Sequence, residues 1–159
     1  MHLTEAIAQH VLEVHEGNNW TEVDVAHTLQ DVTLAEATTL TAASPNTIAA
    51  LLHHLTFWNR VLVRRIQGIA TEVGPANGFD VPTLRTHADW LALQADNLRS
   101  AHELAAAIRG FAEAKLTEAI MPGYSSAYKN LQGSVEHIHY HLGQLVLLKK
   151  LVRSQPASA

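Results

Sequence analysis

Apolar residues recur at helical spacing along four long segments, and this periodicity constrains the fold more than any other feature. A spacing of three or four residues places side chains on one face of a helix. We expect long helices at about residues 3–15, 45–67, 83–109 and 126–151. No segment shows the alternation that is typical of a strand. The sequence therefore predicts an all-α four-helix bundle.

The connection between the first two long helices is expected to be long and partly helical. Residues 20–41 show only weak helical patterning, because threonines and an aspartate interrupt it. Ser44 followed by Pro45 is typical of a helix start and predicts where the second long helix begins. We assign residues 1–153 to a single bundle domain and residues 154–159 to a flexible C-terminal tail.

The third long helix is predicted between two segments rich in turn residues. Residues 74–82 hold glycines and prolines and should form a loop, and Gly110 should end the helix. A short helix is expected at about residues 111–119. The stripe expected to face the core from the third long helix is Leu91, Gln94, Leu98, Ala101, Ala105 and Ile108.

Composition excludes several classes of function. The 159 residues include no cysteine, so disulfides and thiolate ligands are excluded. A net charge of −4 argues against nucleic-acid binding, and we interpret Arg60, Arg64 and Arg65 as a solvated helix edge. The chain has neither the roughly 20-residue apolar run of a membrane helix nor the features of a signal peptide. We therefore expect a soluble, cytoplasmic protein without membrane contact.

The chain contains eleven histidines, and three of them have the spacing and direction of metal ligands. His137 and His141 are four residues apart, so they project from one face of the fourth long helix. On the second long helix, His54 lies about 100° from the centre of the apolar stripe and His53 about 160° away. His54, His137 and His141 together predict a metal site with nitrogen ligands, which suit zinc, nickel, copper or iron.

Other histidines give alternatives to this site. A pair at this spacing also arises by chance in a histidine-rich chain, and His139 lies on the other side of its helix. His10, His87 and His102 fall near the apolar stripes of their helices. Each of these three is by default a hydrogen-bonded core histidine, and each is an alternative as an additional ligand or a partner of a ligand.

Two segments resemble a known family of metalloproteins. Residues 52–59 (LHHLTFWN) and 136–144 (EHIHYHLGQ) resemble, in pattern and order, the two signature segments of the DinB-like, YfiT-like superfamily. Residues 17–20 and 145–151 continue the likeness, which covers nearly the whole chain. The resemblance implies a four-helix bundle, often dimeric, that holds a divalent metal. Mapped onto this sequence, the implied ligands are His54, His137 and His141.

The resemblance also implies a range of activities. Characterised relatives include thiol-dependent S-transferases and a thiol-dependent isomerase, so we expect a metal-dependent S-transferase or hydrolase acting on a small molecule. Zinc or nickel is the expected metal, with iron, manganese and copper as alternatives, and a low-molecular-weight thiol is the expected cosubstrate. The catalytic residues are not identified, although Trp58, Tyr140 and Glu136 lie near the site. The alternative is a non-catalytic, stress-related bundle, in which the metal stabilises the fold or a homodimer.

Overall fold

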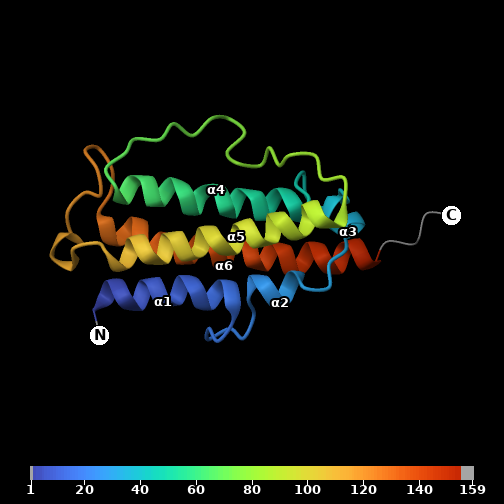
Figure 1. The fold of residues 1–159 in the computed structure, drawn as a ribbon, viewed down its shortest axis with the longest axis horizontal. Coiled ribbons are helices and arrows are strands. Elements are labelled where there is room, and N and C mark those ends of the chain that lie inside the picture. Colours follow the sequence, from blue (N-terminus) through green and yellow to red (C-terminus); the bar gives the residue numbers. More distant parts are fainter. Residues whose placement is uncertain (1, 155–159) are drawn as a thin grey trace.

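The computed structural model describes residues 2–154, and its regular structure is helical. Figure 1 shows four long helices side by side: α1 (Leu3–Glu16), α4 (Ile48–Ile66), α5 (His87–Arg109) and α6 (Ala127–Ser154). The shorter elements are α2 (Val25–Leu29), α3 (Leu34–Thr38) and the 3₁₀ helix η1 (Glu113–Lys115). The predicted all-α four-helix bundle and its partly helical crossover between α1 and α4 are therefore confirmed.

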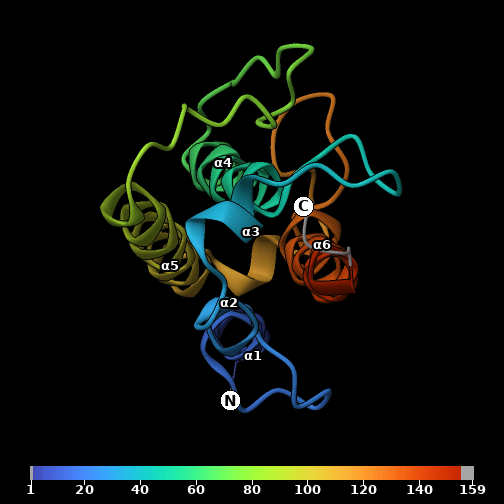
Figure 2. The same cartoon turned by 90° about the vertical axis from the view of Figure 1, so that its right-hand side faces the viewer.

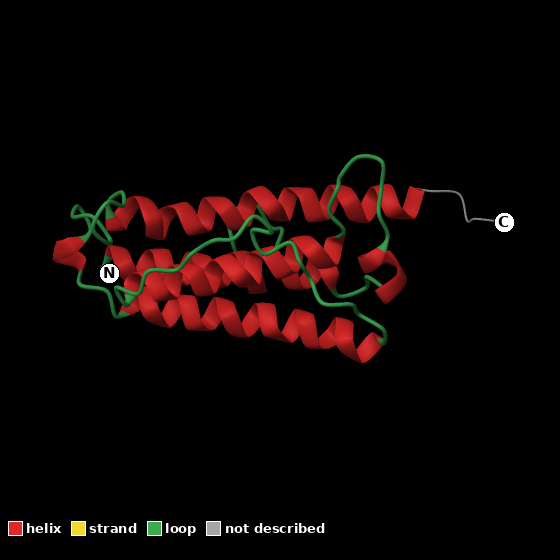
Figure 3. Ribbon diagram, turned by 90° about the horizontal axis from the view of Figure 1, so that it is seen from above, coloured by secondary structure: helices red, strands yellow, loops and turns green. Residues whose placement is uncertain are grey.

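The four long helices occupy the corners of a square when the bundle is viewed along its axis (Figure 2). Each packs on two neighbours, in the order α1, α5, α4, α6 and back to α1. The helices α4 and α5 run in the same direction, so the chain between them returns along the length of the bundle (Figures 1 and 3). This long return segment, residues 67–86, lies over the outside of α4.

The crossover is fixed to the rest of the bundle by polar contacts. Thr33 and Glu36 form a capping box that begins α3. Lys149 pairs with Asp31, and Arg153 pairs with both Asp31 and Glu36, so the last turns of α6 hold the crossover in place.

Two helix starts differ from the sequence prediction. The side chain of Thr47, and not that of Ser44, caps α4 by accepting a hydrogen bond from the Ala50 amide. Ser44 instead bonds the backbone of Asn46 in the turn before the helix. The helix α5 begins at His87, a few residues later than predicted, because Thr86 forms a capping box with Asp89.

The buried face of α5 also differs from the predicted stripe. Leu91 is 50% exposed, whereas Trp90, Leu93 and Leu104 are buried in the core. Part of the buried face is polar: Asn97 donates to Thr56 Oγ1 on α4 at 3.1 Å, and Ser100 accepts from Asn59 at 3.0 Å. The predicted stripe is right for Ala101, Ala105 and Ile108, which are buried, and wrong for Leu91, because polar residues share the inner face with apolar ones.

The helix predicted at 111–119 is reduced to the single 3₁₀ turn of η1. Of the predicted flexible tail, Ser154 is the last residue of α6, and residues 155–159 lie outside the described residues. The assignment of residues 1–153 to one domain stays a prediction. Within the described part of the chain, no helix is both long enough and apolar enough to cross a membrane.

Candidate metal centre

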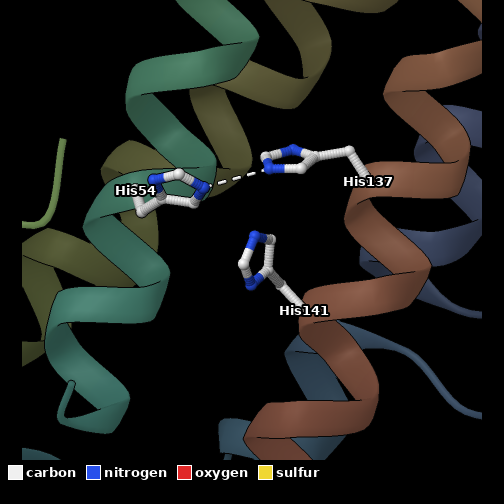
Figure 4. A group of neighbouring side chains, drawn as sticks. All are labelled: His54, His137 and His141. Atoms are coloured by element: carbon white, nitrogen blue, oxygen red, sulfur yellow. Dashed lines mark hydrogen bonds between the residues drawn. The ribbon is translucent and has the colours of Figure 1, made fainter. Parts of the chain in front are cut away.

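The three predicted ligands lie together between α4 and α6. Figure 4 shows the His54 ring entering from α4 and the rings of His137 and His141 entering from successive turns of α6. One ring nitrogen from each histidine lies within 4.8 Å of the other two. Among residues 2–154, these three histidines form the one group of three or more His, Asp or Glu side chains that lie close enough together to bind a single metal ion.

His54 is oriented by the return segment between α4 and α5. Its Nδ1 donates to the backbone carbonyl of Asn77 at 2.6 Å, so in the neutral ring the lone pair lies on Nε2. The ring of Phe79 stacks on the imidazole, with the centroids 4.0 Å apart and the planes 7° from parallel. These two contacts fix the imidazole with its Nε2 directed at α6.

His141 is oriented in the same way by its own helix. Its Nδ1 donates to Oε1 of Gln144, one turn later, at 2.7 Å. The lone pair of the neutral ring is therefore also on Nε2. The Nε2 atoms of His54 and His137 lie 3.0 Å apart, close enough for the His137 ring to donate a hydrogen bond to His54.

Burial keeps all three rings neutral near pH 7. The pKa of His137 is lowered to about 4, first by burial and then by the neighbouring His141 and His54. Burial also lowers the pKa values of His54 and His141, while their hydrogen bonds to Asn77 and Gln144 oppose the shift. A neutral imidazole is the form that binds a metal, so the site has the protonation state of a ligand set.

The donor set fits a divalent transition metal. Two imidazole nitrogens at about 2.0–2.1 Å from one tetrahedral ion are separated by about 3.3 Å, close to the 3.0 Å between His54 and His137. Hydrogen bonds from Nδ1 to oxygen acceptors are the usual support of metal-binding histidines, and two of the three rings have one. The residues present could therefore bind such a metal.

The remaining histidines do not join this group. His53 turns away and donates from Nδ1 to the Gly78 carbonyl at 2.8 Å, and His139 contacts His10 on α1. His102 pairs with Glu16 at the surface, and His87 is exposed in the first turn of α5. Within residues 2–154, therefore, none of His10, His87 and His102 supplies a fourth ligand.

The three histidines line a cavity of about 430 Å³, a size that suits a small molecule. Trp58 also lines it, with its ring 5.9 Å from that of His137. Glu136 is exposed, and Tyr140 is 65% exposed although its ring lies 4.9 Å from that of His141. Of the three neighbours named from the sequence, Trp58 alone lines the cavity.

Sequence reasoning missed the residues that orient the ligands. Asn77 and Phe79 come from the segment predicted only as a loop, and the Asn77-Gly78 pair is itself a turn signal with left-handed backbone angles. Gln144 could have been found, because a residue three positions after a helical histidine lies beside it.

The fold and site define a class: helical bundles in which three neutral imidazoles from two adjacent helices converge on one cavity. A model of the DinB superfamily matches residues 19–145, and the chain belongs to this superfamily. The match spans both histidine segments, so the predicted resemblance is confirmed. No curated protein and no solved structure matches the chain.

Proposed function

We propose that the protein is a metal-dependent enzyme, an S-transferase or a hydrolase, that delivers a low-molecular-weight thiol or water to a small electrophile. His54, His137 and His141 would hold the metal, with zinc or nickel preferred over iron, manganese or copper. The observation that supports this proposal is the convergence of three neutral imidazoles on a cavity of about 430 Å³. A divalent metal bound there supplies Lewis acidity, which lowers the pKa of a thiol or a water molecule.

The chain's own residues prepare the site for this chemistry. Asn77 and Gln144 hold two imidazoles by their Nδ1 protons, which leaves the Nε2 lone pairs free. Trp58, Phe79 and Leu62 give the cavity an apolar wall that excludes water from a bound electrophile. The thiol comes from outside the chain, because the sequence contains no cysteine.

The site has three protein ligands and no fourth, and this number favours a catalytic metal over a structural one. Structural zinc sites are usually closed by four protein ligands, whereas catalytic sites keep one position open for water or substrate. Within residues 2–154, the histidines that could close the shell lie elsewhere.

The first test is metal content after reconstitution with zinc or nickel. Untagged wild-type protein should bind about one equivalent, and His54→Ala, His137→Ala and His141→Ala should each lose most of it. His139→Ala is the matched control, since this neighbour on α6 points away from the site and contacts His10 instead, and it should keep the metal. Less than about a tenth of an equivalent in the wild type would contradict the site.

The second test is turnover. Glutathione, bacillithiol and mycothiol would each be offered with monochlorobimane, which becomes fluorescent when it forms a thioether. The metal-loaded wild type should accelerate the reaction of at least one thiol, and His54→Ala should lower the rate about a hundredfold or more. A loaded protein that accelerates none of these reactions, and binds no thiol, would favour a structural role for the metal.

A further inference from the structure

Two cationic side chains line the same cavity as the three histidines. Arg65 comes from α4 and Lys129 from the first turn of α6. No aspartate or glutamate is among the described residues that line this cavity, although the chain as a whole has a net charge of −4. The cavity therefore concentrates positive charge in an otherwise acidic protein, and a divalent metal would add to it.

Arg65 is held in place by aromatic rings and not by an acidic partner. Its guanidinium carbon lies 5.2 Å from the ring centroid of Trp58 and 5.0 Å from that of Tyr124. Its Nε is buried without a hydrogen-bond partner, and within residues 2–154 the side chain forms no ion pair. Arg60, five residues earlier, is by contrast neutralised by Asp96. The charge of Arg65 is thus left for a ligand.

This environment corrects the interpretation of the arginine cluster as a solvated helix edge. Arg64 fits that interpretation, because it is exposed and its Nε donates to Thr71 on the surface. Arg65 instead turns towards Trp58, whose ring also contacts that of His137. One indole ring therefore separates the guanidinium from the imidazoles.

Lys129 approaches the cavity from the other helix. It precedes His137 by eight residues, about 12 Å along the axis of α6, and it is exposed at the cavity's edge. Within the described part of the chain, its ammonium group has no acidic partner. Arg65 and Lys129 therefore lie on the same side of the histidines, towards the end of α4 and the start of α6.

We infer that the cavity binds a thiol that also carries a carboxylate. The sulfur lies at the three histidines, and the carboxylate binds Arg65 and Lys129 on the order of 10 Å away. A planar guanidinium pairs well with a carboxylate, and stacking on aromatic rings holds the guanidinium in one orientation. The binding of the sulfur at the histidines rests on the proposed function, whereas the binding of the carboxylate depends only on Arg65 and Lys129.

The test compares two probes on cobalt-loaded protein: 6-mercaptohexanoate and its neutral analogue 6-mercaptohexan-1-ol. Binding of a thiol to cobalt gives a charge-transfer absorption, which yields a dissociation constant without turnover. The wild type should bind the carboxylate about tenfold more tightly than the alcohol. Arg65→Gln and Lys129→Gln should each reduce this preference, and the double variant should abolish it.

Two further variants control for loss of structure. Arg65→Lys keeps the charge but not the planar, stacked guanidinium, so it should retain part of the preference for the carboxylate and more of it than Arg65→Gln does. Arg64→Gln removes an adjacent arginine that does not line the cavity, and its preference should equal that of the wild type. An equal affinity for both probes in the wild type, or a preference that survives in the double variant, would overturn the inference.

Calorimetry with hexanoate, which has no thiol, separates the two proposals. If neither thiol changes the cobalt spectrum, the proposed thiol chemistry is wrong. Hexanoate binding that is lost in Arg65→Gln would then still support the cationic subsite. Absence of hexanoate binding in the wild type, together with no preference between the two thiols, would overturn the subsite itself.

Discussion

The imidazoles of His54 and His141 each donate from Nδ1 to an oxygen acceptor, and this single bond decides which nitrogen faces the cavity. The acceptor for His54 is a backbone carbonyl in the return segment, whereas the acceptor for His141 is the amide oxygen of Gln144. A side-chain acceptor can be removed by substitution, but a backbone carbonyl cannot. Gln144 is therefore the residue at which the role of orientation can be measured.

Gln144→Leu should weaken metal binding about ten- to a hundredfold without removing a ligand. The substitution keeps the approximate size of the side chain but leaves Nδ1 of His141 without its acceptor. A competition titration of zinc against a chelator measures the change. Gln132→Leu, on the same helix but outside the site, is the control and should bind zinc as the wild type does. Equal affinity in the two variants would show that the bond has no role in metal binding.

At the scale of elements, the return segment of residues 67–86 is part of the site. Three hydrogen bonds tie its Asn77-Gly78 turn to α4: those from His53 and His54 to the carbonyls of Gly78 and Asn77, and one from Trp58 Nε1 to Asn77 Oδ1 at 3.0 Å. Asn77 and Gly78 both have left-handed backbone angles, with φ of 51° and 77°. This turn brings the segment back onto the histidines.

Gly78→Ala should disrupt this turn. A Cβ at residue 78 would lie 2.7 Å from Phe57, and its positive φ is unfavourable for alanine. We expect the free energy of unfolding to fall by about 2 kcal/mol, and zinc affinity to fall because the Asn77 carbonyl moves away from His54. Urea unfolding and zinc titration measure the two effects.

Gly74 supplies the control in the same segment. A Cβ there meets no atom within 4 Å, and its φ is outside the left-handed range. Gly74→Ala should therefore change the free energy of unfolding by less than about 0.5 kcal/mol. If Gly78→Ala were equally neutral, the segment would not depend on its tight approach to Phe57.

The contrast between helices and return segment also shows what the sequence could predict. Apolar periodicity was sufficient for α1, α4 and α6, because each buries an apolar stripe, and it located only part of the buried face of α5, where Asn97 and Ser100 also face inward. Helical spacing predicted the geometry of His137 and His141. The contact between His54 and Asn77 spans 23 residues and depends on the path of an irregular segment. Local pattern contains no signal for such a contact.

At the scale of the whole molecule, Asn59 joins two polar regions of the bundle. It lines the histidine cavity between α4 and α6, and it also donates a hydrogen bond to Ser100 on α5. The charge of the cavity could not be predicted from the sequence, because Arg65 and Lys129 meet only when α4 and α6 pack together. The predicted homodimer and cytoplasmic location stay predictions.

A further polar feature, His15, is buried on α1 beside α2 and α5. Its Nδ1 donates to the Val11 carbonyl at 2.8 Å, and its buried Nε2 has no hydrogen-bond partner among the described residues. Burial lowers the pKa of His15 to about 4, although the Val11 carbonyl and the nearby Glu16 oppose the shift. The ring is therefore neutral in the native protein at every pH above about 4.

This lowered pKa makes the stability of the fold depend on pH. Above about pH 6.5, His15 is neutral in both the native and unfolded states, and the free energy of unfolding does not depend on its protonation. As the pH falls from 6.5 towards 4, the unfolded chain binds a proton that native His15 does not, so the free energy of unfolding falls. Between pH 7.5 and 5.0, the loss attributable to His15 should be about 2 kcal/mol.

His15→Asn isolates this contribution, because asparagine retains a donor for the Val11 carbonyl but does not titrate. The variant will be less stable at pH 7.5, since it loses part of the ring's volume from the core. Its free energy of unfolding should nevertheless fall less than that of the wild type between pH 7.5 and 5.0, by about 2 kcal/mol.

Urea unfolding of the metal-free wild type and variant at several pH values measures how the free energy of unfolding of each protein depends on pH. The other histidines with lowered pKa values, among them His137, act equally in the two proteins and cancel in the comparison. If the free energy of unfolding depended on pH in the same way in both proteins, His15 would have the same pKa in the native and unfolded states, and the prediction would be wrong.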